Sequence, residues 1–349
     1  MSDLFLAVDG GQSGTVAVLG TADGTIVGVG RGGPIRHHEE ADAERLVRES
    51  LLAAVTEAMT GATDRGEVVM SCLAVTGSAS IANQVIRELV ITGKYLMLES
   101  DICAALASGT AGAGGVGLIA GTGTVAIAQG RRGEQVILGG WGWLIGDEGG
   151  GFWIAMEALK AAVRDVDGTG PSTALTSALL ERLGQRDMRG VYNLVTGQRF
   201  DRTAIAALAM SVVAIAEAGD RLAASILDSA AGHLSELVVA TVAAAPFLEP
   251  DERVVVACGG VLRADGWVVT QMARQLAERA PEFRLVVPAV PPVIGAYYLA
   301  LKELGVPIDD ELQDRVADQV RPLTTLTSKM TFAPSHQPPL RGEPSCTTP

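Results

Sequence analysis

The 349-residue sequence has little of what several classes of protein require. It carries 27 Lys and Arg against 40 Asp and Glu, a formal net charge of −13, and no basic cluster. This charge argues against a nucleic-acid partner and against binding to an anionic membrane surface. The four cysteines show no CxxC spacing and the four histidines no HExxH motif, so we expect a reducing cytoplasm and no structural metal.

Two common nucleotide-binding motifs are missing as well. No GxxxxGK[ST] pattern occurs, which excludes a P-loop protein. Residues 121–126 match GxGxxA, but a strand pattern follows them instead of a helix, which argues against a Rossmann fold. Any bound phosphate must therefore be held by another kind of glycine-rich structure.

Signals for export and for membrane insertion are not seen. The first three residues lead directly into an apolar strand, without the basic and hydrophobic regions of a signal peptide. Residues 102–130 are uncharged and long enough to span a bilayer, but eight glycines interrupt them, so no membrane segment is predicted. The 48% of hydrophobic residues is ample for the cores of two domains.

One construction occurs twice, 109 residues apart. Each copy reads as strand, glycine-rich turn, strand, turn, strand. Two facing glycine-rich turns can wrap phosphates with backbone N–H groups, because glycine lets the main chain approach closely. Each copy alone reads as an ordinary hairpin, but the duplication favours nucleotide binding. The matching residues are Gly14, Thr15, Ala17, Gly24, Gly30 and Gly33, and after them Gly123, Thr124, Ala126, Gly133, Gly139 and Gly142.

Alternating strand and helix patterns follow each copy, which predicts an α/β protein. The first 98 residues read as βββαβαβ. Residues after 328 are rich in Pro, Ser and Thr without periodicity, which predicts a disordered tail. The predicted helices cover 41–59, 81–90, 102–108, 152–163, much of 202–244, 267–279 and 295–305, and the further strands 68–75, 95–98, 254–258 and 283–287.

Carboxylates stand at two positions where ligands usually bind. Asp101 follows the strand at 95–98, and ligands gather beyond the carboxyl ends of strands in open α/β sheets. An aspartate before a helix can equally be an N-cap. Residues 139–151 combine glycines with two tryptophans, Asp147 and Glu148, which suits a loop that lines a sugar site. The two carboxylates could instead only complement a helix dipole.

With these features in place, the sequence resembles the BadF/BadG/BcrA/BcrD-type ATPases, and within them the N-acetylglucosamine kinases of the actin/hexokinase/Hsp70 superfamily. The resemblance covers roughly residues 4–305, and its most specific piece is GGWGxxxGDEG at 139–149. It implies two RNase H-like α/β lobes that close over the ligands, commonly in a dimer. The expected lobes are 1–111 and 112–328, with a last helix that could pack back on the first lobe, followed by the tail at 329–349.

The resemblance also implies an activity and a set of site residues. The expected enzyme is an ATP-dependent kinase that phosphorylates the 6-hydroxyl of an amino sugar with MgATP. Asp101 matches the catalytic base, and Asp9 matches the acidic position that faces magnesium. ATP-binding positions are Gly10, Gly11, Ser13, Gly121, Thr122, Gly123, Gly259, Gly260 and Ala264, and sugar-binding positions are Thr124, Val125, Gly140, Trp141, Gly142 and Asp147.

Two departures from the family pattern affect the choice of sugar. Arg36 follows the turn Gly33-Pro34-Ile35 where related kinases often carry Asn, and Val125 stands where some carry Asn. A guanidinium suits a carboxylate, so Arg36 in the cleft would favour N-acetylmuramic acid over glucosamine, whereas a solvated Arg36 would not affect the choice. N-acetylglucosamine, glucosamine and N-acetylmuramic acid therefore remain the expected substrates.

Two other functions stay open. Other branches of the family are ATPases that activate a radical enzyme, and these need an iron–sulfur cluster held by cysteines at a dimer interface. None of the four cysteines directly follows the second glycine loop, which argues against that branch. A non-catalytic sugar or nucleotide sensor is the second alternative, and the presence of Asp9, Asp101 and Asp147 argues against it.

Overall fold

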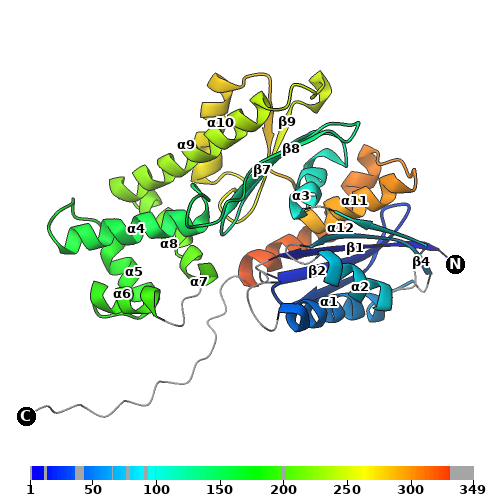
Figure 1. Cartoon of the computed structure of the whole chain (residues 1–349), viewed down its shortest axis with the longest axis horizontal. Coiled ribbons are helices and arrows are strands. Elements are labelled where there is room, and N and C mark those ends of the chain that lie inside the picture. The colour runs from blue at the N-terminus through cyan, green and yellow to red at the C-terminus, as the bar shows by residue number, and fades with distance from the viewer. Residues whose placement is uncertain are drawn as a thin grey trace, which may run out of the picture.

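The computed structural model describes residues 2–11, 14–35, 43–64, 66–75, 79–89, 93–98, 100–197 and 202–330. Within these residues, two five-stranded sheets form the centres of two lobes, and helices cover them (Figure 1). The α/β class predicted from the sequence is confirmed. The predicted disordered tail at 329–349 starts too early, because residues 329 and 330 still belong to the last helix, and residues 331–349 lie outside the described residues.

The N-terminal lobe contains a mixed sheet with the strand order β3-β2-β1-β4-β5. Strands β1, β2 and β3 form an antiparallel meander, while β4 pairs in parallel with β1 and β5 with β4. The order βββαβαβ predicted for this part of the chain is found. Its elements are β1 (Asp3–Gly11), β2 (Gly14–Thr21), β3 (Ile26–Gly32), α1 (Ala43–Thr60), β4 (Glu67–Val75), α2 (Ala79–Leu89) and β5 (Lys94–Met97).

The C-terminal lobe repeats this topology strand for strand. Its sheet has the order β10-β9-β6-β7-β8, with an antiparallel β6-β7-β8 meander and parallel β9 and β10. The internal repeat predicted from the 109-residue offset is thereby confirmed. The strands are β6 (Gly115–Ala120), β7 (Thr124–Gln129), β8 (Gln135–Gly139), β9 (Val254–Cys258) and β10 (Arg284–Val286).

Between β8 and β9 the chain forms a group of helices, which makes up the end of the C-terminal lobe at the left of Figure 1. The sequence predicted α4 and the helical character of α7 to α9 but missed α5 and α6. The helices are α4 (Gly151–Val166), α5 (Leu175–Leu183), α6 (Met188–Thr196), α7 (Arg202–Ala206), α8 (Ala209–Glu217) and α9 (Arg221–Ala243), and α10 (Trp267–Arg279) follows β9.

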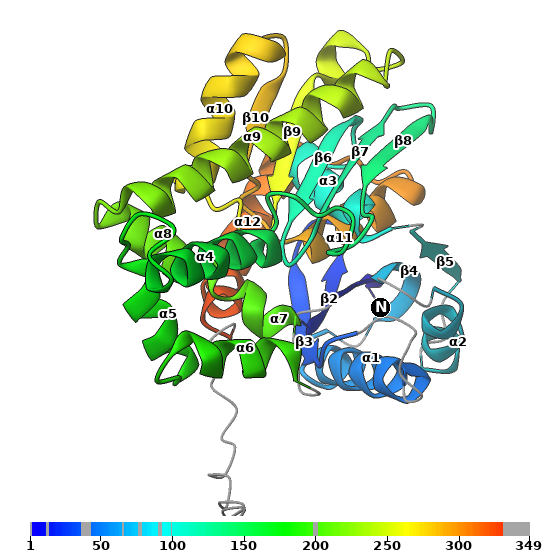
Figure 2. The same cartoon turned by 60° about the vertical axis from the view of Figure 1, so that its left-hand side comes forward.

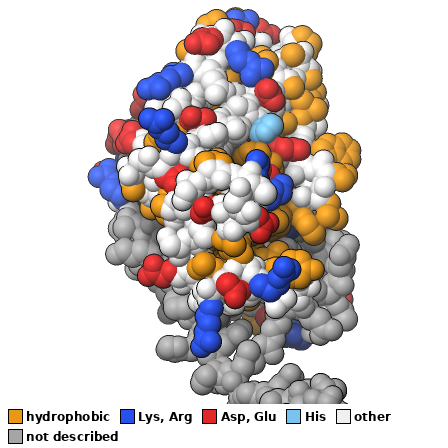
Figure 3. Space-filling view, turned by 90° about the vertical axis from the view of Figure 1, so that its left-hand side faces the viewer, with side chains coloured by type: hydrophobic (Ala, Val, Ile, Leu, Met, Phe, Trp, Pro, Cys, Tyr) orange, Lys and Arg blue, Asp and Glu red, His pale blue; other side chains and the backbone are white. Residues whose placement is uncertain are grey.

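The outer face of these helices is mixed in character. Figure 3 shows this end of the molecule, where acidic, basic and hydrophobic side chains are interspersed. A groove of about 670 Å³ lies between α4, α6 and α9, lined by apolar residues such as Leu159, Val191 and Ile226. Helix α9 is long and apolar enough to cross a membrane by length and composition alone, but it packs against α10 and β7 in the core.

The last two helices, α11 (Pro292–Glu303) and α12 (Asp310–Met330), pack back on the N-terminal lobe. Tyr297 of α11 is fully buried beside Phe5 and its hydroxyl donates to the carbonyl of Thr21. Gln319 of α12 accepts from the amide of Ile26 and donates to the carbonyl of Gly24, so it binds the β2–β3 turn on both sides. Helix α12 was not predicted from the sequence.

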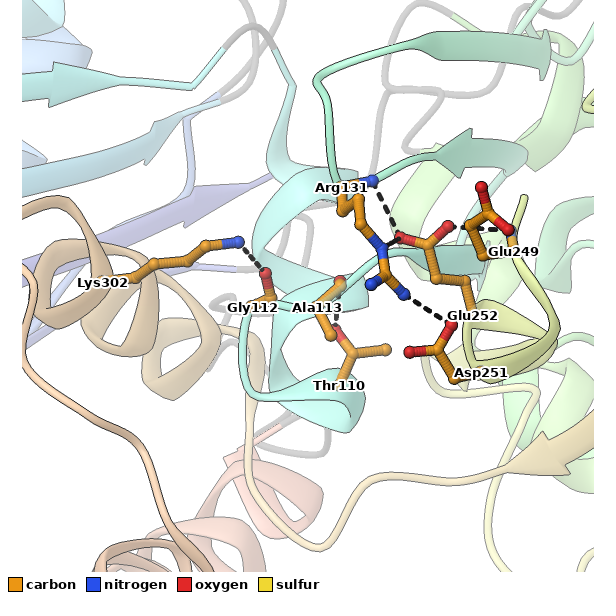
Figure 4. Close-up of polar contacts among 8 residues, drawn as sticks. All are labelled: Thr110, Gly112, Ala113, Arg131, Glu249, Asp251, Glu252 and Lys302. Carbon is orange, nitrogen blue, oxygen red and sulfur yellow. Dashed lines mark hydrogen bonds and ion pairs between the residues drawn. The ribbon is translucent and has the colours of Figure 1, made fainter. Parts of the chain in front are cut away.

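The chain crosses from the first lobe to the second through α3 (Asp101–Thr110) and the turn that follows it. Lys302 of α11 donates to the Gly112 carbonyl at 2.5 Å, as Figure 4 shows. On the same side of the second lobe, the buried carboxylate of Glu252 accepts from the Arg131 amide and guanidinium, at 2.8 and 3.2 Å. A buried carboxylate needs such partners, so this contact fixes the β7–β8 turn to the segment before β9.

Candidate functional site

Asp9 and Asp101 lie together where the two lobes meet. Asp9 stands near the end of β1 and Asp101 is the first residue of α3, and both are half-buried. Ser100, not Asp101, is the N-cap of α3, because its Oγ accepts from the Ile102 amide at 3.4 Å. Ser100 also donates to Asp101 Oδ1 at 3.2 Å. The N-cap alternative for Asp101 is therefore wrong, because Ser100 fills that position.

The charge state of Asp9 reflects this neighbourhood. Burial, and then the negative charge of Asp101, raise the pKa of Asp9 from 3.8 to about 7. Both effects disfavour the ionised form of this carboxylate, and a cation would favour it. The site is therefore suited to a ligand that brings a cation with it.

The predicted second phosphate loop is a tight turn held by the start of α4. Within it, the Gly121 amide donates to the Gly123 carbonyl at 3.0 Å. The amides of Gly151 and Phe152, at the first turn of α4, donate to the carbonyls of Gly121 and Thr122 at 2.7 and 3.1 Å. These bonds fix the loop backbone in place without side chains. Sequence reasoning missed this role of Gly151, which the glycine run 149–151 could have indicated.

Asp147 lies directly beneath this loop. Its side chain is 9% exposed, and Oδ1 accepts from the Thr124 amide at 3.2 Å. The carboxylate lies so close to the Cα of Gly123 that a Cβ there would overlap it. The Asp147 backbone has a φ of 63°, a left-handed conformation that is strained for aspartate. Asp147 thus binds the β7 strand, whereas its neighbour Glu148 is exposed.

The predicted adenosine turn follows β9 and packs on the same loop. The Val261 amide donates to the Ala120 carbonyl at 3.1 Å, and Gly259 adopts a φ of 110° against the Ala120–Gly121 peptide. Gly260 and Ala264 are exposed beyond it. The end of β9 also borders Asp9 through Cys258. Burial, and then the negative charge of Asp9, raise the pKa of the Cys258 thiol to about 12.

The predicted sugar-binding positions divide into two groups. Gly140 donates its amide to the Thr124 carbonyl at 2.8 Å and lies against Val125, so these three are together next to Asp147. Trp141 is 74% exposed at the tip of the loop, with open space around Gly142. Its neighbour Trp143 packs edge-on against Phe152, 5.4 Å between ring centroids.

In the first lobe, Gly10 is buried and Gly11 half-buried at the end of β1, while predicted residues Ser13 and Arg36 lie outside the described residues. The turn that leads to Arg36 is firmly held. The hydroxyl of buried Thr15 donates to the Gly33 carbonyl at 3.0 Å. The Thr15 and Ser50 hydroxyls are also within hydrogen-bond distance of each other, at 2.8 Å. Sequence reasoning missed both hydroxyls, which carry no motif.

The residues present fit a magnesium ion that arrives with a nucleotide. No group of three or more His, Cys, Asp or Glu in the described ranges could hold a metal on its own. Magnesium bound with a nucleotide needs only one or two carboxylates, because phosphate oxygens and waters complete its shell. Asp9, with its raised pKa, meets that need.

Comparison with known proteins identifies relatives over nearly the whole length. An N-acetylmuramic acid/N-acetylglucosamine kinase of Clostridium acetobutylicum is 26% identical over 85% of this chain and 98% of its own. An N-acetyl-D-glucosamine kinase of Dictyostelium discoideum is 26% identical over 86% and 98%. A solved candidate N-acetylglucosamine kinase from Chromobacterium violaceum has a TM-score of 0.67 at 25% identity, over 86% and 99%.

More distant structures support the fold. A glucokinase of the ROK family from Streptomyces griseus superposes with a TM-score of 0.54 at 15% identity, over 86% of this chain and 99% of its own. The expected sugar-kinase form of the actin-like ATPase fold is thereby confirmed. Residues 6–300 match the BadF/BadG/BcrA/BcrD ATPase family. The chain belongs to the BadF/BadG/BcrA/BcrD ATPase family.

Proposed function

We propose that the protein is an ATP-dependent kinase that phosphorylates the 6-hydroxyl of an amino sugar, N-acetylglucosamine or a close relative. The observation that carries this proposal is the pair of Asp9 and Asp101 at the junction of the lobes, which the end of β9 connects to the glycine turn at 121–123. The activities named for the two curated relatives support the choice of substrate. Glucosamine and N-acetylmuramic acid remain in the proposed substrate class.

The proposed mechanism assigns one task to each part of the site. Backbone amides of the turn at 121–123, except that of Gly121, which donates within the turn, bind the phosphates together with the turn at Gly10 and Gly11, and Asp147 with Trp141 orients the sugar. Asp101, at the first position of α3, takes the proton from the sugar hydroxyl as it attacks. Phosphoryl transfer needs mainly such positioning and electrostatic stabilisation. Closure of the lobes would keep water from the γ-phosphate.

Magnesium would be held by Asp9 together with the ATP phosphates. When bound, the ion neutralises charge that develops on the phosphates. In the free protein, burial and the negative charge of Asp101 raise the pKa of Asp9, and a cation beside it would oppose both effects. The proposed enzyme is a cytoplasmic homodimer, and light scattering after size exclusion tests the dimer.

The cysteines support a kinase over an activator of a radical enzyme. Cys72, Cys103 and Cys258 are buried within the lobes, and burial raises the pKa of the Cys72 and Cys258 thiols. A cluster at a dimer interface needs thiolates that reach the surface. Broad visible absorbance in anaerobically purified protein would reverse this ranking.

The test of the proposed function is ADP release across a panel of hexoses and N-acetylhexosamines. We expect the rate to rise above the sugar-free rate with at least one amino sugar, and most strongly with N-acetylglucosamine or a close relative. Equal rates with and without every sugar would overturn the kinase proposal and favour a sensor.

A further inference from the structure

A polar pair stands beside the exposed turn that follows β9. Trp267, the first residue of α10, donates from its indole Nε1 to Asp228 Oδ1 of α9 at 2.8 Å. Asp228 is exposed and Trp267 half-buried. No motif pointed to either residue. Helices α9 and α10 lie side by side above the turn in both Figure 1 and Figure 2.

The contacts around α9 place this pair close to the phosphate loop. Gly149, two residues before α4, lies against the carbonyl of Ala230 on α9, where a Cβ would come within 2.8 Å of that oxygen. Gly151 in turn donates to the Gly121 carbonyl. Asp228 lies two residues before Ala230 and therefore on nearly the opposite side of α9, so the helix contacts the loop segment with one side and the start of α10 with the other.

The other side of the gap is formed by the turn itself. Gly259 packs on the Ala120–Gly121 peptide, and the chain then runs through exposed Gly260 and Ala264 to Trp267. The space beyond Gly260 is open, because a Cβ there would meet nothing within 4 Å. A nucleotide with its phosphates on residues 121–123 would therefore direct its base between this turn and Asp228.

The Asp228 carboxylate has one oxygen left for a ligand. Its Oδ1 accepts from the indole, and within the described residues Oδ2 has no hydrogen-bond partner. An ionised carboxylate only accepts hydrogen bonds. Adenine presents an amino group at its six position, which donates, whereas guanine presents a carbonyl oxygen there, which also accepts and is repelled.

We propose that Asp228 binds the six-amino group of adenine and selects ATP over GTP, and that Trp267 is the residue that positions Asp228. The inference rests on the proposed function, since it assigns the base to the same nucleotide site. A donor–carboxylate bond of this kind changes affinity about tenfold or more. Removing it leaves an adenine donor without its acceptor and removes the repulsion of guanine.

The test compares kcat/KM for ATP and GTP in Asp228→Asn, with N-acetylglucosamine or whichever sugar is active. We expect the ATP/GTP ratio to fall about tenfold or more, while KM for the sugar stays unchanged. Binding of ADP and GDP by calorimetry should show the same shift without turnover. Trp267→Phe keeps the ring and loses the donor, so its ratio should fall by a smaller factor.

The matched control is Glu236→Gln, two turns further along α9 and exposed, which should leave the ratio unchanged. An unchanged ATP/GTP ratio in folded, active Asp228→Asn would overturn the inference and leave the kinase proposal intact. A selective loss of discrimination against 2′-deoxyATP would also overturn it, because Asp228 would then bind the ribose. Absence of sugar-dependent ADP release in the wild type would instead overturn the proposed function.

Discussion

The two β-meanders share one topology but are covered in different ways. In the first lobe, Gly28, Gly30 and Gly32 of β3 face α1 so closely that a Cβ on each would overlap the carbonyl oxygens of Ala58, Ala54 and Ser50. At the positions 109 residues later stand Ile137, Gly139 and Trp141, and the two large side chains are 47% and 74% exposed. The third strand of the meander is thus tightly covered by a helix in the first lobe, whereas the equivalent segment of the second lobe is largely exposed.

This difference assigns separate tasks to the two lobes. Helix α1 on one face and α11 with α12 on the other hold the first meander, and with it the strand that carries Asp9. The edge strand β8 of the second meander has less cover, and it leads into the exposed loop of Trp141. The same fold thus gives a tightly packed lobe that carries Asp9 and an exposed loop that would meet the sugar in the proposed function.

The largest expected effect concerns Asp101 at the boundary of the two lobes. Asp101→Asn keeps the shape of the side chain and loses its basicity, so turnover should fall about a hundredfold to ten-thousandfold, the usual range for a general base. Sugar affinity, measured by calorimetry, should persist. Near-normal turnover would show that the position of Asp101 at the head of α3 has no chemical role.

A pair of glycine substitutions tests the comparison of the meanders directly. Gly30→Ala places a Cβ on the Ala54 carbonyl and should lower the free energy of unfolding by about 3 kcal/mol. Gly139→Ala, at the equivalent position, meets Leu237 and Thr124 only at 3.3 Å but has a φ of 78°, which should cost about 1–2 kcal/mol. Equal losses in urea unfolding would contradict the difference in cover.

Asp9 should weaken the ligand-free first lobe at neutral pH. Its pKa is about 7 in the folded protein and 3.8 in the reference state, so the folded state binds more protons between these values. Its contribution to stability is therefore complete below about pH 4 and is lost as pH rises through 7. Above pH 7, Asp9→Asn should be more stable than wild type by up to roughly 4 kcal/mol, at about 1.4 kcal/mol per unit of pKa shift, while its kinase activity is lost. Thermal melts without magnesium at pH 4 and pH 8 measure this. A variant equally stabilised at both values would argue against the raised pKa.

The smallest expected effect concerns the open loop. Trp141→Phe should weaken sugar binding roughly threefold to tenfold, in line with the worth of an aromatic contact, and should diminish the tryptophan fluorescence change on adding sugar. Trp143→Phe is the matched control, because Trp143 packs on Phe152. If Trp141→Phe keeps both the signal and the affinity, the loop does not contact the sugar.

The sequence predicted the features that depend on local pattern. The meanders, the helices with a strong apolar period and the glycine turns all appear where expected, because turn chemistry and periodicity are local. It missed α12, whose polar composition hides a single apolar stripe formed by Leu312, Val316 and Val320. That stripe is buried only because it packs on the β2–β3 turn, which is far away in the sequence.

The site shows the same division. The glycines at 121–123 and Asp147 could be named from motifs, and the structure brings them together. The support from Gly151, and the pairing of Asp228 with Trp267, join residues far apart in sequence and carry no motif. Likewise, only the structure shows that Ser100, and not Asp101, caps α3.

The central claim, transfer of phosphate to a sugar 6-hydroxyl, is tested most directly with 6-deoxy-N-acetylglucosamine. The analogue keeps the groups that orient the sugar and lacks the hydroxyl that Asp101 would deprotonate. We predict that it competes with N-acetylglucosamine but gives no ADP release above the sugar-free rate, while N-acetylglucosamine yields a 6-phosphate by mass spectrometry and phosphorus NMR. ADP release with the analogue equal to that with N-acetylglucosamine would contradict the account.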